Sequence, residues 1–473
     1  MTRADLAYLP AARAAALLRR SEISPIELVE VYLERIAALD GELRAYITVC
    51  GDSAREAARQ AERALASGAD VGPLHGLPIA VKDQFYTHGV RTTAGSRILR
   101  GFVPDEDATV IARLRAAGAI LLGKLNLSEF ALGGTRVHPY GQPRNPWALD
   151  REPGGSSSGS GIAAAAALCS AALGEDTGGS VRGPASYCGV VGLRPTWGRI
   201  SRFGCVPVSW SMDAAGPLAR TVEDTALLLG VIAGHDPKDL LTSRRAVPDY
   251  LHALTGEIRN LKIGVIQELI ESEDTDPEVR RAVGAAALLL SRLGADVGPA
   301  SLPLLPRAGA VFMALADSEG AGFHHRWLRE RPDEYDAATR RRLLAASLIP
   351  ASAHQAAQRA RSLIREEILD AFKRYDLLLA PSQPTPAPPI AAASEPVTSG
   401  PDASRRFFTR RSYSTPASLA GTPALSLPCG VSAGGLPIGL QLIGRPFDEA
   451  TVLRAGHAYE RATEWHDRRP PAS

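Results

Sequence analysis

The sequence offers little for covalent cross-linking or metal binding. Its five cysteines include no Cys-x-x-Cys pair and no cluster with histidine at metal-ligand spacing. An odd number of cysteines also argues against a disulfide framework of the kind that secreted proteins use. We therefore expect a reducing, cytoplasmic compartment and no metal site.

Charge of one sign and long apolar runs are also missing. The 473 residues include 53 basic and 51 acidic ones, interleaved along the chain, so no surface field should attract nucleic acid or anionic lipid. The longest apolar stretch, residues 161–174, is too short to span a bilayer, and its many alanines predict a buried helix. The first 20 residues lack the apolar core of a secretion signal. We expect a small, roughly neutral partner, with no nucleic acid and no membrane.

Lysine is scarce, because it accounts for only five of the 53 basic residues. A desolvated lysine can lose its proton, whereas arginine keeps its charge, so a lysine in an apolar segment is a candidate for proton chemistry. Mutational bias would also explain the scarcity, and Lys238 and Lys373 lie among charged residues. Lys82 directly follows the apolar run GLPIAV, at the expected end of a buried strand, where burial should lower its pKa.

Apolar runs and helical periods alternate along the chain, which indicates an α/β protein. Ser24 and Pro25 are placed to begin a helix in the first 70 residues, which look helical. Strands are predicted at 76–81, 119–123, 261–266, 376–381, 424–428 and 438–444. Helices are predicted from Thr221 and at 108–118, 275–293, 354–374 and 448–462. Residues 383–405 are rich in Pro, Ala and Ser and predict a surface loop that covers a site.

Two Gly/Ser segments, GGSSSGSG (154–161) and DTGGSVRG (176–183), are the strongest signal for chemistry. Residues 155–159 fit the G-x-S-x-G motif with Ser157 as nucleophile, but no core strand precedes them. A phosphate-binding loop would need a lysine followed by Ser or Thr after the glycines, and none is present. A flexible linker is the structural alternative, yet an alanine-rich apolar segment joins the two runs directly.

The segment from Thr177 to Ser180 favours nucleophilic catalysis. Its glycines, Gly178 and Gly179, allow the backbone N–H groups of Thr177, Gly178, Gly179 and Ser180 to turn toward one point, as an oxyanion hole requires. Ser180 would then be the nucleophile, and a serine hydroxyl needs a base. The ten histidines show no local pattern for a Ser–His pair, so Lys82 is the better candidate, although a distant histidine stays open.

These segments resemble the motifs of the amidase signature family, and the resemblance covers nearly the whole chain. The matching segments are GLPIAVKDQF (76–85), KLNLSEFALGGT (124–135), RNPWALDREPGGSSSGS (144–160), ALGEDTGGSVRGPASYCGVVGLRPTWGRISRFG (172–204), MDAAGPLARTVED (212–224) and LPIGLQLIGRPFDEATVLRAGHAYE (436–460). The family fold is a mixed twisted sheet between two layers of helices. The resemblance therefore implies a single α/β/α catalytic domain over residues 71–473, with residues 1–70 as a helical segment packed on it.

The resemblance also implies a Ser-cisSer-Lys triad, and the matching residues here are Lys82, Ser156 and Ser180. A cis peptide bond would join Gly155 to Ser156. Such an amidase needs no metal and no cofactor, because the base and the nucleophile are side chains of the protein itself.

Five charged residues near these motifs are candidates for supporting roles. Asp176 and Arg182 flank the predicted oxyanion hole, and we expect them to support it, by pairing with each other, rather than to touch substrate. Arg136, His138 and Arg199 are candidates for the mouth of the site, with solvated loop charges as the simpler alternative.

The family contains stand-alone amidases, some of which cleave anilides, aryl esters or carbamates, and the glutaminase subunit of the tRNA-dependent amidotransferase. That glutaminase typically has a Met-Gly-Ser segment where this chain has residues 131–134, and an acidic residue for the substrate's amino group near Arg411. These departures predict a stand-alone hydrolase of small amides or carbamates, and the alternative is the glutaminase. A non-catalytic binding protein is disfavoured because all three reactive positions hold the required residue types. A homodimer is left open.

Overall fold

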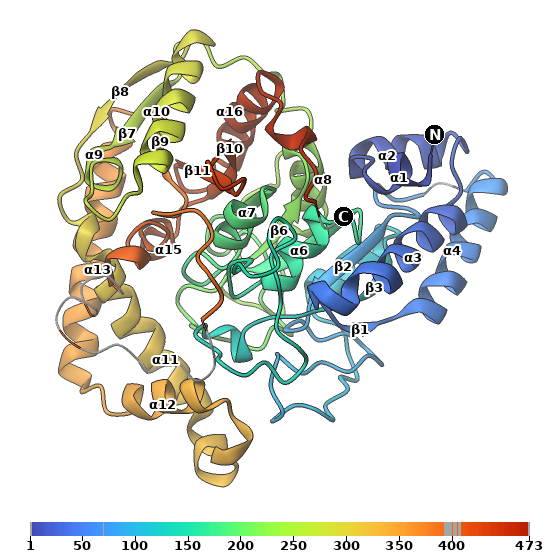
Figure 1. The fold of residues 1–473 in the computed structure, drawn as a ribbon, viewed down its shortest axis with the longest axis horizontal. Coiled ribbons are helices and arrows are strands. Elements are labelled where there is room, and N and C mark those ends of the chain that lie inside the picture. Colours follow the sequence, from blue (N-terminus) through green and yellow to red (C-terminus); the bar gives the residue numbers. More distant parts are fainter. Residues whose placement is uncertain (1, 70, 392–399, 401–403, 405–407, 472–473) are drawn as a thin grey trace.

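Runs of Leu, Ile, Val and Ala form a central sheet in the computed structural model, which describes residues 2–69, 71–391, 400, 404 and 408–471. Within these residues, eleven strands make one mixed sheet (Figure 1). Their order across the sheet is β1 (Tyr46–Val49), β3 (Ile120–Leu125), β2 (Pro78–Lys82), β4 (Ala171–Glu175), β6 (Ala215–Ala219), β5 (Val191–Arg194), β10 (Ala424–Val431), β11 (Pro437–Gly444), β9 (Leu377–Pro381), β7 (Lys262–Ile266) and β8 (Asp296–Ala300).

Helices flank the sheet, as an α/β/α architecture requires (Figure 1). The helices described are α1 (Arg3–Ala7), α2 (Ala11–Arg19), α3 (Pro25–Leu43), α4 (Gly51–Ala66), α5 (Thr109–Ala116), α6 (Ser158–Ala165), α7 (Arg182–Cys188), α8 (Val222–Ile232), α9 (Gln267–Ile270), α10 (Pro277–Arg292), α11 (Ala308–Glu330), α12 (Ala337–Ala346), α13 (Ala351–Ala371), α15 (Thr415–Ala420) and α16 (Glu449–Arg461). Helices α1–α4 gather at one end of the molecule and α11–α13 at the other (Figure 1). None of the described helices is long and apolar enough to cross a membrane.

The sheet topology brings the Gly/Ser segments to one edge. Strands β2 and β4 are parallel neighbours, with Val81 paired to Leu173. Because the carboxyl ends of parallel strands lie at the same edge, Lys82 at the end of β2 comes to lie beside Glu175 at the end of β4. The first Gly/Ser segment leads into α6 and the second joins β4 to α7, so both loops open at this edge.

The predicted strands are all present, with ends that differ by a few residues, and so are the predicted helices outside residues 161–174. These elements have the strongest periodic patterns in the sequence. Ser24 caps α3 as predicted, because its Oγ accepts hydrogen bonds from the N–H groups of Ile26 (3.1 Å) and Glu27 (3.3 Å).

The prediction of a helix over residues 161–174 is wrong. Helix α6 ends at Ala165, and Ala171–Glu175 forms β4 between β2 and β6. Alanine favours a helix over a strand, so the packing of this segment between β2 and β6 overrides the local preference.

The first 70 residues likewise contain a strand that was not predicted, β1, which pairs antiparallel with β3. Of the predicted loop at 383–405, residues 392–399, 401–403 and 405 lie outside the described part of the chain.

Candidate active site

Lys82 is fully buried at the end of β2 and faces two polar groups. Its Nζ donates a hydrogen bond to Ser156 Oγ at 2.9 Å and lies 3.3 Å from Glu175 Oε2. Burial lowers the pKa of Lys82 from its ordinary value of 10.5, and the charge of Glu175 opposes that shift. The lysine therefore sits where loss of its proton is made easier and where a hydroxyl is in direct contact.

Ser156 lies in the loop before α6, and the peptide bond from Gly155 to Ser156 is cis. The next residue, Ser157, has a different role. It is fully buried, its Oγ donates to the carbonyl oxygen of Glu175 at 3.1 Å, and the Glu175 N–H donates back at 3.3 Å. With its hydroxyl engaged by the backbone of β4, Ser157 ties α6 to the sheet, and the G-x-S-x-G interpretation finds no support.

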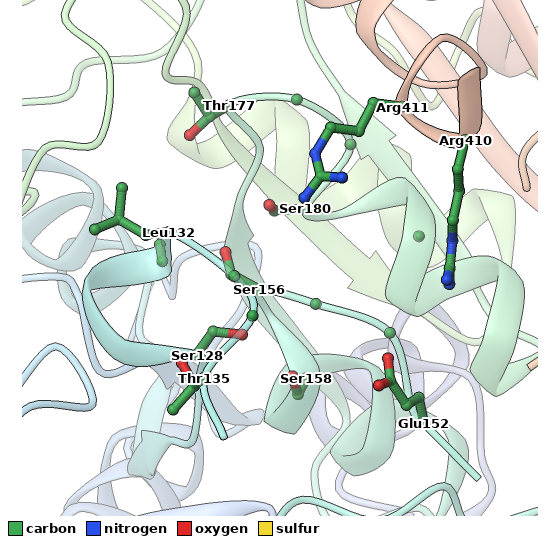
Figure 2. A pocket seen from close by; sticks show the side chains of 18 of the residues that line it. Ser128, Leu132, Thr135, Glu152, Ser156, Ser158, Thr177, Ser180, Arg410 and Arg411 are labelled. Atoms are coloured by element: carbon green, nitrogen blue, oxygen red, sulfur yellow. The ribbon is translucent and has the colours of Figure 1, made fainter. Parts of the chain in front are cut away.

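Ser180 lies between β4 and α7 and lines the same cavity as Ser156. Figure 2 shows the two hydroxyl groups next to each other on one side of the cavity. The three sequence-predicted residues are thus brought together from β2, from the loop before α6 and from the loop after β4.

Backbone N–H groups beside Ser180 are free to bind an anion. Among the described residues, the N–H groups of Thr177, Gly178 and Ser180 have no hydrogen-bond acceptor. The Gly179 N–H donates to Asp176 Oδ1 at 2.8 Å, which removes it from the expected set of four donors. The sequence does not reveal this hydrogen bond, because it depends on the position of the Asp176 side chain.

Close packing explains the two glycines in this turn. Gly179 has φ +116°, and a Cβ at Gly178 would lie 2.3 Å from the ring of Phe312. Ser414 Oγ donates to the carbonyl oxygen of Gly178 at 2.6 Å, which fixes the orientation of that peptide. A side chain at either position would displace the backbone that carries the free N–H groups.

Asp176 and Arg182 pair beneath the turn, and both are fully buried. Arg182 Nε and Nη2 each lie 3.1 Å from an Asp176 carboxylate oxygen, and Arg194 Nη1 lies 3.2 Å from Oδ1. Burial alone would raise the pKa of Asp176, but the two guanidinium groups hold it well below its ordinary value of 3.8. The carboxylate also accepts the N–H of Val181 at 3.1 Å, so it holds the turn in shape.

A cavity of about 1020 Å³ opens over Ser156 and Ser180. Arg136 and His138 line it, as expected, and burial lowers the pKa of His138 to about 4, so this imidazole is neutral near pH 7. Arg199 does not contribute to the described lining; it is buried against Glu449 at 3.5 Å.

Sequence analysis named Arg411 but did not single out three other charged residues that line the cavity, Glu152, Arg342 and Arg410. Figure 2 shows the guanidinium group of Arg411 directed toward Ser180, while Arg410 lies across from Glu152. Burial lowers the pKa of Arg411 to about 9, and Arg342 adds to that shift, but the group stays cationic at neutral pH. No local pattern marks residues that come from different ends of the chain.

Glu175 is the second omission, and here a signal was available. It ends the apolar segment AALG just as Lys82 ends PIAV, and a carboxylate in a buried strand calls for a partner. No group of His, Cys, Asp and Glu among the described residues could hold a metal ion.

Comparison with known proteins extends over nearly the whole chain. The family model described as Amidase matches residues 27–453. A curated relative from Geobacter metallireducens (strain ATCC 53774 / DSM 7210 / GS-15), named as a glutamyl-tRNA(Gln) amidotransferase subunit, is 43% identical over 475 residues, which cover 95% of this chain and 96% of the relative.

Solved structures agree with this assignment. A chain from a vestigial protein complex, described as revealing the evolutionary origins of an s-triazine catabolic enzyme, has a TM-score of 0.88 and 36% identity over 96% of this chain and 98% of its own. A 6-aminohexanoate cyclic dimer hydrolase complexed with substrate has a TM-score of 0.88 and 31% identity over 98% and 99%. The chain therefore belongs to the amidase signature family.

Proposed function

We propose that this protein hydrolyses carbon–nitrogen amide bonds through an acyl-enzyme on Ser180, with Ser156 and Lys82 as the proton-transfer groups. The observation that carries the proposal is the 2.9 Å hydrogen bond between Lys82 Nζ and Ser156 Oγ, beside Ser180 at the floor of the cavity. A buried lysine with a lowered pKa can act as a base, and a serine in contact with it can pass on a proton.

The proposed reaction begins when Ser180 Oγ attacks the substrate carbonyl carbon. Ser156 takes the proton of Ser180 while neutral Lys82 takes the proton of Ser156. The N–H groups of Thr177, Gly178 and Ser180 would hold the oxyanion, and each well-placed donor contributes about 3–4 kcal/mol to the transition state. Ser156 then protonates the leaving amine, and water hydrolyses the acyl-enzyme.

The finer choice of substrate rests on the charges above Ser180. Arg411 is cationic and directed toward the nucleophile, so a substrate ammonium group at that place would be repelled (Figure 2). Free glutamine carries such a group next to a carboxylate that Arg411 would attract, so the cation disfavours glutamine only when the ammonium group is the one that faces it. This arrangement supports a stand-alone hydrolase that takes small amides without an ammonium group there, with anilides, carbamates and esters as further candidates.

A second candidate is the glutaminase subunit of a tRNA-dependent amidotransferase. The observation in its favour is the 43% identity, over nearly the full length of both chains, to a relative named as a glutamyl-tRNA(Gln) amidotransferase subunit. Overall identity therefore favours the glutaminase, and the charge of Arg411 favours the stand-alone enzyme. Under the glutaminase candidate, the expectation of no nucleic-acid partner would no longer hold.

A panel of substrates distinguishes the two candidates. The purified chain is assayed alone on an aliphatic amide, an anilide, an aryl carbamate, an aryl ester and glutamine, with Ser180→Ala as the control. Turnover of amides other than glutamine that disappears in Ser180→Ala supports the stand-alone amidase. Turnover of glutamine alone supports the second candidate, and activity that survives in Ser180→Ala contradicts both.

The Arg411→Asp variant adds a direct test of charge to the substrate panel, because it exchanges the cation above Ser180 for an anion. If the charge at this position selects against the ammonium group, the variant gains in kcat/KM for glutamine relative to an uncharged aliphatic amide. An unchanged ratio would mean that Arg411 does not face the substrate's amino group.

A further inference from the structure

A chain of four buried polar side chains extends from Lys82 through Glu175 and Thr177 to Asp213, and Thr177 also lines the cavity. Lys82 Nζ lies 3.3 Å from Glu175 Oε2, Glu175 Oε1 lies 2.8 Å from Thr177 Oγ1, and Thr177 Oγ1 lies 2.8 Å from Asp213 Oδ1. None of the four residues is more than 4% exposed. Three titratable groups are therefore joined in one buried line.

The hydrogen count at Thr177 restricts the charges in this line. A hydroxyl has one hydrogen to donate, yet Thr177 Oγ1 lies at hydrogen-bond distance from a carboxyl oxygen of both Glu175 and Asp213. It can donate to one of them and must accept from the other, which requires that the other carboxyl be protonated. Burial and the charge of Glu175 also raise the pKa of Asp213 to about 8, in agreement with one shared proton near neutral pH.

We propose that Glu175, Thr177 and Asp213 form a proton-sharing chain that sets the charge of Lys82. The proposal rests on the proposed function of Lys82 as the base, and it assigns the other three as positioning residues that act through Lys82. With the proton on Asp213, Glu175 is a carboxylate and stabilises Lys82 as an ammonium. With the proton on Glu175, Lys82 faces a neutral acid and is free to be an amine.

The proton shift balances with the chemistry at Ser156. When Lys82 Nζ accepts the proton of Ser156 Oγ, Glu175 Oε1 gives its proton to Thr177 Oγ1. The original hydroxyl proton of Thr177 passes to Asp213 Oδ1 in the same step. Lys82 gains one positive charge, Glu175 gains one negative charge, and Asp213 loses its negative charge. The new ammonium therefore forms beside a carboxylate that was absent before the step.

Neighbouring groups allow Asp213 to carry the charge when the shared proton moves to Glu175. Its Oδ2 accepts the N–H of Val208 at 2.8 Å, and its Oδ1 accepts the N–H of Ser209 at 2.9 Å. Two other titratable or charged groups face the chain. Cys205 is neutral because burial raises the pKa of its thiol well above 9.0, and Arg194 is held by Asp176. Neither of them supplies a proton to Glu175.

The scarcity of lysine makes the charge of Lys82 measurable. With ¹³Cε-labelled lysine the protein gives only five side-chain signals, which are assigned by substituting each lysine in turn. Lys82 and Lys124 are buried, and Lys124, 3.3 Å from Asp83, serves as an internal control in the same spectrum. The titration needs no substrate, so it reports on the chain separately from the activity.

Two isosteric variants give opposite expected shifts. Glu175→Gln removes the carboxylate beside Lys82 and lowers the pKa of the lysine by about 1–3 units. In Asp213→Asn, an amide oxygen at the Oδ2 position keeps the N–H groups of Val208 and Ser209 bound and turns the amide nitrogen toward Thr177. Thr177 then accepts from that nitrogen and donates to Glu175, so Glu175 stays ionised and the pKa of Lys82 rises. Lys124 keeps its titration in both variants, and the ascending limb of the pH profile of kcat/KM moves with Lys82.

The direction in which Asp213→Asn shifts the pKa of Lys82 is the decisive test of the proposal. A simple loss of negative charge would lower the pKa of Lys82. A lowered or unchanged pKa therefore overturns the proposal of a proton-sharing chain. Thr177→Val provides a second route, because it cuts the link without touching either acid. In that background Asp213→Asn no longer raises the pKa of Lys82, whereas Thr177→Ser restores the effect. If Lys82→Ala keeps full amide turnover, the proposed function fails as well, and the two failures are distinguishable.

Discussion

Two buried lysines on neighbouring strands have nearly the same burial, the same distance to a carboxylate oxygen and the same direction of pKa shift. Lys82 at the end of β2 and Lys124 on β3 are both fully buried, and each lies 3.3 Å from a carboxylate oxygen, Glu175 for the first and Asp83 for the second. Burial lowers the pKa of both lysines from 10.5. A buried ion pair alone therefore does not mark the candidate base.

The remaining partners separate the two lysines. Lys124 Nζ donates to Phe85 O and to Thr92 Oγ1, both at 2.7 Å, and none of its partners is among the described residues that line the cavity, so these contacts and the charge of Asp83 favour the ammonium form. Its partner Asp83 is held by the N–H of Thr93 at 2.8 Å. Lys82 Nζ donates to Ser156 Oγ, to Glu175 Oε2 and to the carbonyl oxygen of Glu175 at 3.4 Å. Its hydroxyl partner, Ser156, lines the cavity together with Ser180, and its carboxyl partner belongs to the proposed proton-sharing chain.

The largest predicted difference between the two lysines is in the catalytic activity of their arginine variants. Lys82→Arg keeps a positive charge but cannot act as a base near neutral pH, so it should lose amide turnover by about 10⁴-fold or more, like Lys82→Ala. Lys124→Arg, assayed per folded molecule, should keep kcat/KM within about tenfold, because Lys124 takes no part in the chemistry. If Lys82→Arg retains a tenth of the wild-type rate, Lys82 is an electrostatic support, and the base must be sought among the histidines.

The second prediction concerns stability, for which the substitution of Lys124 should have a larger effect than the substitution of Lys82. Lys124→Met leaves Asp83 as a buried, unpaired carboxylate and should destabilise the fold by about 3–5 kcal/mol in urea unfolding. Lys82→Met should cost about half of that or less, because Glu175 can hold the proton that it shares with Asp213. Adding Asp83→Asn to Lys124→Met should recover much of the loss. Equal losses for the two single variants would remove the distinction between the pairs.

The third prediction concerns the hydroxyl beside Lys82, because Ser156 lines the cavity and Thr92, the hydroxyl partner of Lys124, is not among the described lining residues. Ser156→Ala should reduce amide hydrolysis about 100-fold more than hydrolysis of an activated aryl ester, because an amine must be protonated to leave and a phenolate need not be. Steady-state kinetics on a matched anilide and aryl ester measure the difference. Equal losses on both substrates would mean that Ser156 is not the acid for the leaving group.

The sequence was sufficient to identify the candidate site residues that stand out from their immediate neighbours in the chain. Lys82 stood out because a lysine ended an apolar run, and Ser156 and Ser180 because Gly/Ser segments enclosed them. Strands such as Leu377–Pro381 and Pro437–Gly444 were predictable because apolar runs of that length favour burial in a sheet.

The partners of these residues could not be predicted, because they depend on strand order. Glu175 lies on β4, whose alanine-rich sequence predicted a helix, and its neighbour β2 is distant in the chain. Asp213 reaches Thr177 across 36 positions of sequence, and the loss of the Gly179 N–H to Asp176 is a matter of side-chain geometry. The sequence marks Glu175 as a carboxylate at the end of an apolar segment, but which residues pair with one another follows from the assembled sheet.

The smallest expected effect tests whether the two lysine sites are electrically independent. A base works only when it is unprotonated, so kcat/KM should rise with pH through the ionisation of Lys82. Burial lowers the pKa of this ammonium from 10.5, which places the rise at a lower pH than a free lysine would give. The Lys124→Met, Asp83→Asn double variant removes one positive and one negative charge together, so the field at Lys82 changes little, and the limb should move by less than about 0.5 unit. Rates measured across the ascending limb in the wild type and in this variant check the prediction. A shift of more than a full unit would show that the second pair helps to set the charge of Lys82, and the two sites would then have to be treated as one network.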